Sequence, residues 1–212
     1  FTPLIWLNYF ITRLITRNAS SIQDISAEEI KIIAKMGRQA GAIAPEQERI
    51  IRNILNLHGL RAGEVMTPRT VVMSLDRNLT VSAAREQAGG WPHSRVPVYD
   101  QNKESMIGVV MRRDVFNALA DGRDDLTLGA LERRAHFVPE LARLDQLFKE
   151  FLQRREHLFL VVDEYGDFAG IITLEDVLEE IVGVEIVGEF DPVVDMQERA
   201  RRRQHSIIRR RP

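Results

Sequence analysis

The chain of 212 residues contains no cysteine, which excludes disulfide bridges, thiolate metal ligands and cysteine nucleophiles. Its five histidines are scattered along the sequence, and no pair of them stands at the spacing of zinc ligands. No serine lies in a G-x-S-x-G elbow of the kind that exposes a hydrolase nucleophile. These absences argue against a metal site held by side chains alone, and they leave a Ser-His-Asp enzyme possible only in principle.

Long apolar runs are also missing. The charge-free stretch at the start of the chain ends at Arg13, well short of the about 20 apolar residues that a membrane-spanning helix needs. Pro3, the aromatic residues Trp6 and Tyr9, and the basic Arg13 and Arg17 are typical of the end of a membrane segment at the lipid–water interface. An amphipathic helix packed on a core is the alternative. We interpret residues 1–20 as the membrane-proximal end of a transmembrane domain, cut from a longer membrane protein.

The net charge of −2 conceals an uneven distribution. Seven of the 29 basic residues lie between Arg199 and Pro212, and the remaining 22 stand against 31 acidic residues in positions 1–198. An acidic folded part does not favour nucleic acid as a partner. We expect residues 185–212 to form an acidic linker and an arginine-rich tail, which is either a solvated end or a contact for anionic lipid.

Two helices are predicted over residues 26–59. Ser26 and Glu29 stand at the spacing of a capping box, and Gly41 ends the first helix. Pro45 occupies a first helical position, and Gly59 closes the second helix. We expect residues 21–59 to form a helical linker.

After Gly59 the sequence repeats. "VPVYDQNKESMIGVVMRRDVFNAL" (96–119) aligns without gaps on "LFLVVDEYGDFAGIITLEDVLEEI" (158–181), at an offset of 62 residues. Each copy reads as strand, polar turn, strand and helix, and a helical stretch precedes each. Two copies of an α/β unit of about 60 residues are too few for a solenoid. They predict a pseudo-symmetric pair that buries a shared sheet face, with a cleft between the copies.

With G-h-h-x-x-x-D at each strand-to-helix turn, the repeats resemble a tandem pair of CBS domains, a Bateman module. "GEVMTPRTVV" (63–72), "HSRVPVYD" (93–100) and "TLEDVLEEIVG" (173–183) resemble the CorC/CNNM family of magnesium and cobalt efflux proteins, also called hemolysin-like. The resemblance implies an α/β fold of two CBS domains, residues 60–123 and 124–184, related by pseudo-twofold symmetry and preceded by the helical linker.

The resemblance also implies a setting for this module. A transmembrane domain precedes the CBS pair in this family, so we expect the chain to lie on the cytoplasmic side of a membrane and to pair into a homodimer. The arginine-rich end departs from the usual continuation of the family. The implied function is regulation of magnesium and cobalt efflux by a bound adenine nucleotide, without catalysis. A purely structural dimerisation module that binds no nucleotide is the alternative.

Thr173 and Asp176 stand three residues apart where a strand turns into a helix. From these residues alone, a helix cap explains the pair, because a threonine hydroxyl and an acid both bind free amides there. The family resemblance adds a second role, in which both side chains hold the ribose of an adenine nucleotide. The two roles are compatible, and we predict both.

Two further residues complete the predicted nucleotide site. The resemblance implies that Arg95 contacts the phosphates, a role that suits a guanidinium, and that Thr67 lines the nucleotide. A surface ion pair for Arg95 and a turn hydroxyl for Thr67 are the alternatives. Magnesium is expected to arrive with ATP, because it keeps several of its waters and binds phosphate oxygens. The acidic residues of 179–195 are expected to form a solvated face.

The two copies are not equivalent at this turn. Met111 stands where the second copy has Thr173, and Arg112 and Arg113 follow it. A thioether has no donor for a ribose oxygen and is only a weak acceptor. We therefore predict one nucleotide per chain, in the half built around Thr173 and Asp176.

Overall fold

The computed structural model describes residues 25–89 and 91–184. The chain divides into two compact units, residues 1–55 and 56–212. The interpretations of residues 1–20 and 185–212 lie outside the described residues. Within the described ranges, every helix is too short or too polar to cross a membrane.

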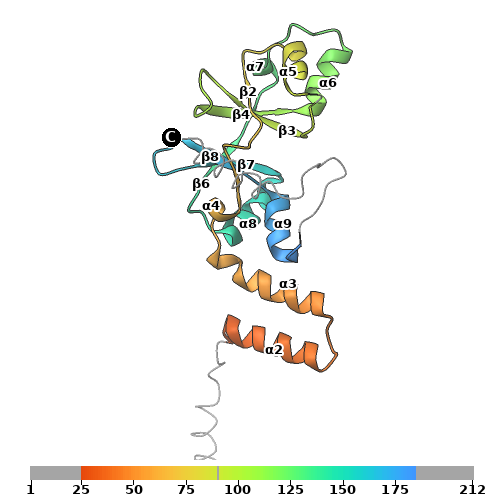
Figure 1. Ribbon diagram of the computed structural model, residues 1–212, viewed down its shortest axis with the longest axis vertical. Coiled ribbons are helices and arrows are strands. Elements are labelled where there is room, and N and C mark those ends of the chain that lie inside the picture. Colours follow the sequence, from red (N-terminus) through yellow and green to blue (C-terminus); the bar gives the residue numbers. More distant parts are fainter. Residues whose placement is uncertain (1–24, 90, 185–212) are drawn as a thin grey trace, which may run out of the picture. The chain divides into compact units, whose positions relative to one another are not determined.

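The described part of the first unit is a helical hairpin of α2 (Ala27–Gln39) and α3 (Pro45–Asn56), seen in Figure 1. The predicted capping box is confirmed, because the Glu29 N–H donates to Ser26 Oγ and the Ser26 N–H donates to a Glu29 carboxylate oxygen. Gly41 has a φ of +73° in the turn, a conformation that favours glycine. The second helix ends at Asn56, earlier than expected, and the 3-10 helix η1 (Leu57–Gly59) reaches Gly59.

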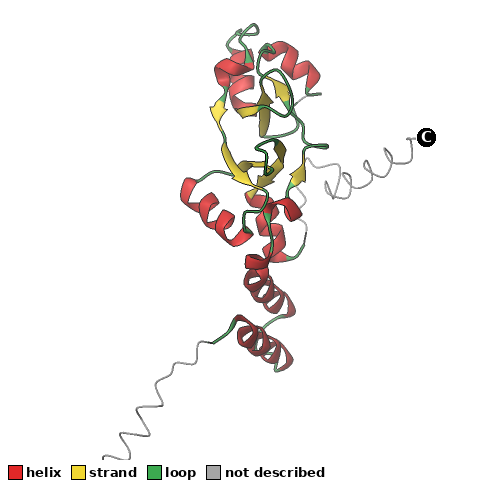
Figure 2. Ribbon diagram, turned by 90° about the vertical axis from the view of Figure 1, so that its left-hand side faces the viewer, coloured by secondary structure: helices red, strands yellow, loops and turns green. Residues whose placement is uncertain are grey.

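The second unit holds two four-stranded sheets, with strand orders β2-β3-β4-β5 and β1-β8-β7-β6. Helices accompany both sheets (Figure 2). The strands of the first sheet are β2 (Leu75–Asp76), β3 (Arg95–Tyr99), β4 (Met106–Met111) and β5 (Arg133–Arg134), and those of the second are β1 (Thr67–Pro68), β6 (His136–Pro139), β7 (Leu158–Val162) and β8 (Phe168–Thr173). The helices are α4 (Ala62–Val65), α5 (Val81–Gln87), α6 (Arg112–Ala120), α7 (Leu128–Leu131), α8 (Leu144–Arg154) and α9 (Leu174–Val182). The predicted α/β fold is confirmed.

The repeat is real, but its gapless alignment is wrong. Strand β4 and helix α6 do fall on β8 and α9 at an offset of 62 residues, whereas β2 and β3 fall on β6 and β7 at an offset of 63. The cause is the turn between the two central strands, which has six residues (100–105) in the first copy and five (163–167) in the second. Gly166 closes the shorter turn with a φ of +86°. As a result, the counterpart of Arg95 is Leu158.

The two copies exchange their short leading strands. Strand β1 precedes the first copy but pairs with β8 of the second, and β5 precedes the second copy but pairs with β4 of the first. A Cβ atom on Gly170 would lie 2.3 Å from the Thr67 carbonyl oxygen, and one on Gly108 would lie 2.5 Å from that of Arg133. Each central strand therefore needs glycine where the exchanged strand crosses it.

Equivalent positions of the two copies are buried to the same extent. Val110 on β4 and Ile172 on β8 have no exposed surface, and neither do Val115 on α6 and Val177 on α9. A further apolar cluster joins the copies, with β4 packing against β7 and β8. The prediction that the copies bury a shared sheet face is therefore confirmed. This cluster contains Met106, Val109, Leu158, Leu160 and Phe168.

Candidate functional site

Thr173 ends strand β8 and caps helix α9. Its hydroxyl accepts a hydrogen bond from the Asp176 N–H at 3.1 Å, and its own N–H donates to Asp176 Oδ2 at 2.7 Å. This reciprocal pair satisfies two amides that a helix start leaves without partners. The predicted cap is confirmed, and it fixes both side chains at the junction of strand and helix.

The Asp176 carboxyl group is half-buried, and its surroundings shift its pKa. Burial is the main cause that raises its pKa to about 6; the hydrogen bonds with Thr173 oppose this rise, and the nearby Glu179 and Glu175 carboxylates add to it. Among the described residues, Asp176 forms no ion pair. An acceptor group of this kind suits hydroxyl donors better than phosphate oxygens, because like charges repel.

Thr67 lies on β1, the short strand that joins the second sheet. It pairs with Ile171, two residues before Thr173 on β8, and its side chain is half-buried. The structure therefore brings Thr67 into the same sheet as the capped turn. It does so through the strand exchange, although Thr67 and Thr173 lie more than 100 residues apart in the sequence.

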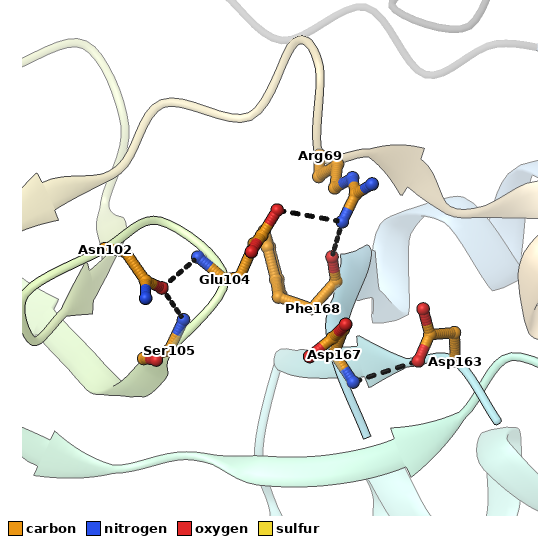
Figure 3. Close-up of polar contacts among 7 residues, drawn as sticks. All are labelled: Arg69, Asn102, Glu104, Ser105, Asp163, Asp167 and Phe168. Carbon is orange, nitrogen blue, oxygen red and sulfur yellow. Dashed lines mark hydrogen bonds and ion pairs between the residues drawn. The ribbon is translucent and has the colours of Figure 1, made fainter. Parts of the chain in front are cut away.

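Contacts on both sides hold the end of β1. The Arg69 N–H donates to the Ala169 carbonyl oxygen at 2.8 Å, and Arg69 Nη1 donates to the Phe168 carbonyl oxygen at 3.4 Å. The same guanidinium lies 3.9 Å from a Glu104 carboxylate oxygen in the turn of the first copy (Figure 3). Both charged groups are exposed, so this ion pair adds little stability, and the backbone bonds chiefly fix Thr67.

Arg95 lies on the other sheet, on strand β3, where it pairs with Met111. Its side chain is half-buried and forms no ion pair with any described residue. The structure thus joins Thr67, Thr173 and Asp176 around one sheet and leaves Arg95 at the equivalent turn of the other. The alternative of a surface ion pair for Arg95 finds no partner among the described residues.

The first copy ends in a different arrangement. Met111 precedes helix α6 and gives it no side-chain cap, as predicted. Asp114, the counterpart of Asp176, accepts two hydrogen bonds on Oδ2, from Arg133 Nε at 3.1 Å and from Arg133 Nη2 at 2.7 Å. Its other oxygen lies 3.5 Å from Arg113 Nε. Sequence reasoning missed Arg133, because only the strand exchange brings it to this turn.

Metal ligands do not gather in this region. Across residues 25–89 and 91–184, no group of three or more histidine, aspartate or glutamate side chains is arranged to hold a metal ion. Any divalent cation at the capped turn would depend on ligands from a bound anion as well as from the chain.

The sequence matches the CBS domain family over residues 62–121 and 129–183. The CBS domain of the bacterial CNNM/CorC family Mg²⁺ transporter is 36% identical, with a TM-score of 0.72, over 77% of this chain and 99% of that one. This chain carries a CBS domain pair of the CorC/CNNM family. The resemblance noted in the sequence is therefore confirmed.

Relatives with longer chains are similar as well. A UPF0053 protein of Synechocystis sp. is 37% identical over all of this chain, and the magnesium and cobalt efflux protein CorC of Escherichia coli is 29% identical over 86% of it. This chain spans 60% and 62% of the lengths of those two proteins. The CBS domain of the bacterial CNNM/CorC transporter in complex with ATP is 34% identical, with a TM-score of 0.63, over 66% of this chain and 99% of that one.

Proposed function

We propose that this CBS pair binds an adenine nucleotide, ATP carried with Mg²⁺, through Thr67, Thr173 and Asp176 of the second sheet and Arg95 of the first. The observation that carries the proposal is the reciprocal Thr173–Asp176 cap beside Thr67. It presents a half-buried carboxylate, which forms no ion pair with any described residue, to the place where ribose hydroxyls would donate. The ATP complex of the CBS domain at 34% identity supports the choice of ligand.

Each part of the nucleotide has a chemical counterpart. Ribose hydroxyls are donors, and a carboxylate accepts them in the way that an acid grips ribose in dinucleotide-binding folds. Thr67 lines the nucleotide from the neighbouring strand. The phosphates need a cation, and the half-buried Arg95 guanidinium is not engaged in an ion pair with any described residue. Mg²⁺ then binds to phosphate oxygens and water, which are the ligands it prefers.

The proposed role is regulation and not catalysis. ATP favours one arrangement of the module over another, and this bias passes to a transmembrane domain of a magnesium or cobalt efflux protein. A ligand shifts such an equilibrium only through its different affinity for the two states. The module works at the cytoplasmic face of the membrane and as a homodimer. The arginine-rich tail, which lies outside the described residues, remains a predicted contact for anionic lipid.

Titration calorimetry with ATP, with and without MgCl₂, tests this proposal on the 212-residue chain when it is paired with a phosphate-release assay. The expected result is saturable binding of one ATP per chain, tighter with Mg²⁺, without release of phosphate. Absence of binding by a folded dimer would favour the structural dimerisation module. Steady release of phosphate would mean that the chain is a hydrolase.

A further inference from the structure

The first copy holds a built-in cation at the place where the second copy is proposed to hold ribose. The exchanged strands make this comparison direct, because β1 and β5 cross the two central strands at the same position. Thr67 pairs with Ile171 on β8, and Arg133 pairs with Val109 on β4. Ile171 and Val109 are equivalent residues at the offset of 62 that relates these strands. Arg133 is therefore the structural counterpart of Thr67.

The Arg133 side chain engages the carboxylate that a sugar would need. Asp114 Oδ2 accepts two hydrogen bonds from this one guanidinium, which uses both lone pairs of that oxygen. The other oxygen faces the Arg113 guanidinium. Neither cation has an equivalent in the second copy, where Thr67 replaces Arg133 and Glu175 replaces Arg113. A ribose hydroxyl approaching Asp114 would have to displace a charge-assisted pair.

We propose that Arg133 is an internal ligand that occupies the first-copy turn and keeps nucleotide from binding there. This inference rests on the proposed function, since it takes the second-copy turn as the ribose site. It also predicts the effect of the substitution Met111→Thr. Met111→Thr restores a hydroxyl, but Asp114 stays hydrogen-bonded to Arg133. That change alone therefore adds no second nucleotide site. A second site requires Arg133→Thr as well, which copies the residue found at the equivalent position.

The test uses the Asp176→Ala background, in which the proposed second-copy site is expected to bind roughly ten- to hundredfold more weakly. Calorimetry with Mg-ATP compares Met111→Thr/Arg133→Thr with Met111→Thr/Arg134→Thr. Arg134 is the matched control, because it is the neighbouring arginine on β5, is exposed, and has no ion pair with any described residue. The expected result is one nucleotide per chain for the Arg133 variant, at least tenfold tighter than for the Arg134 variant.

Equal binding by the two variants, or no binding by either when circular dichroism shows both folded, would overturn the inference. If Arg133→Thr does not fold, Arg133→Gln takes its place, because it keeps the length of the side chain and removes the charge. Failure of the proposed function gives a different result, namely unchanged ATP binding by Asp176→Ala alone. In that case the inference falls with the proposed function, because the second-copy turn is then not the ribose site.

Discussion

The two copies of the repeat have nearly the same backbone and opposite chemistry at one turn. In both, a central strand pairs with an exchanged strand at a glycine and runs into a helix whose inward valine, Val115 or Val177, is fully buried. In the second copy the helix start holds a threonine cap and a carboxylate that forms no ion pair within residues 25–89 and 91–184. In the first copy, Met111 stands at the helix start and gives no side-chain cap, and the carboxylate is paired with Arg133.

The difference separates what the fold requires from what binding requires. Both copies need glycine at Gly108 and Gly170 because backbone atoms occupy the space of a Cβ, and both valines are buried in the core. The polar residues at the turn neither leave room for a crossing backbone nor fill the core. At this turn, Thr67, Thr173 and Glu175 of the proposed ribose site correspond to Arg133, Met111 and Arg113 in the first copy.

The largest expected effect concerns Gly170, the glycine of β8 that pairs with strand β1. Gly170→Ala would place a Cβ 2.3 Å from the Thr67 carbonyl oxygen, so β1 must move, and the free energy of unfolding should fall by an amount at the upper end of about 1–3 kcal/mol. Gly108→Ala should cost a similar amount, because its Cβ would meet the Arg133 carbonyl oxygen. Urea unfolding measures both. Only Gly170→Ala should also weaken ATP binding, and equal weakening by both would contradict the asymmetry.

Arg95→Ala is expected to weaken ATP by about 1.5–3 kcal/mol, which is roughly a ten- to hundredfold loss of affinity. The reason is that only a phosphate-bearing ligand supplies anionic oxygens to the guanidinium. Adenosine should lose little affinity. Calorimetry with both ligands makes the comparison, and Arg134→Ala is the control. An equal loss for ATP and adenosine would mean that Arg95 supports the fold or the base pocket.

Asp176 should make the stability of the nucleotide-free chain depend on pH. Its folded pKa of about 6 lies above the ordinary 3.8, so the folded state binds the proton more tightly than the unfolded state does. Its contribution to the free energy of unfolding is therefore largest below pH 3.8 and is lost as the pH rises to about 6.

The expected loss is about 1–2 kcal/mol, less than the full shift implies, because the half-buried carboxyl keeps some contact with water. Urea unfolding between pH 4 and pH 7 should show it for the wild type relative to Asp176→Asn. A constant difference between the two proteins over this range would show that the carboxyl group has an ordinary pKa.

The smallest effect belongs to the cap itself. Thr173→Ala removes the acceptor of the Asp176 N–H and should lower the free energy of unfolding by about 1 kcal/mol. Thr127→Ala is a matched control, because Thr127 precedes helix α7 without a side-chain cap bond. Thermal unfolding of both variants, without nucleotide, makes the comparison. Equal stability of the two variants would show that the Thr173 hydroxyl does not support helix α9.

The sequence allowed the local features of the site to be predicted. The Thr173–Asp176 cap depends on residues three apart, and the missing cap at Met111 follows from a single side chain. The repeat, both central hairpins and the helix starts at Pro45 and Leu174 were also predictable, because apolar periodicity and punctuating residues mark them.

The features that depend on distant strand pairing could not be predicted in this way. Arg133 reaches Asp114 only because β5 crosses to the other copy, and β5 and β1 share no sequence pattern. The one-residue difference in turn length was hidden because Gly108 and Gly170 still align at an offset of 62. This difference decides that Leu158, and not His157, is the counterpart of Arg95.

The most direct test of the central claim compares two aspartates by calorimetry with Mg-ATP. The account predicts that Asp114→Ala binds one nucleotide per chain with the affinity of the wild type. It predicts that Asp176→Ala binds roughly ten- to hundredfold more weakly, because a hydrogen bond to a charged group is lost. Two tight sites per chain in the wild type, or a loss of affinity in Asp114→Ala alone, would contradict it.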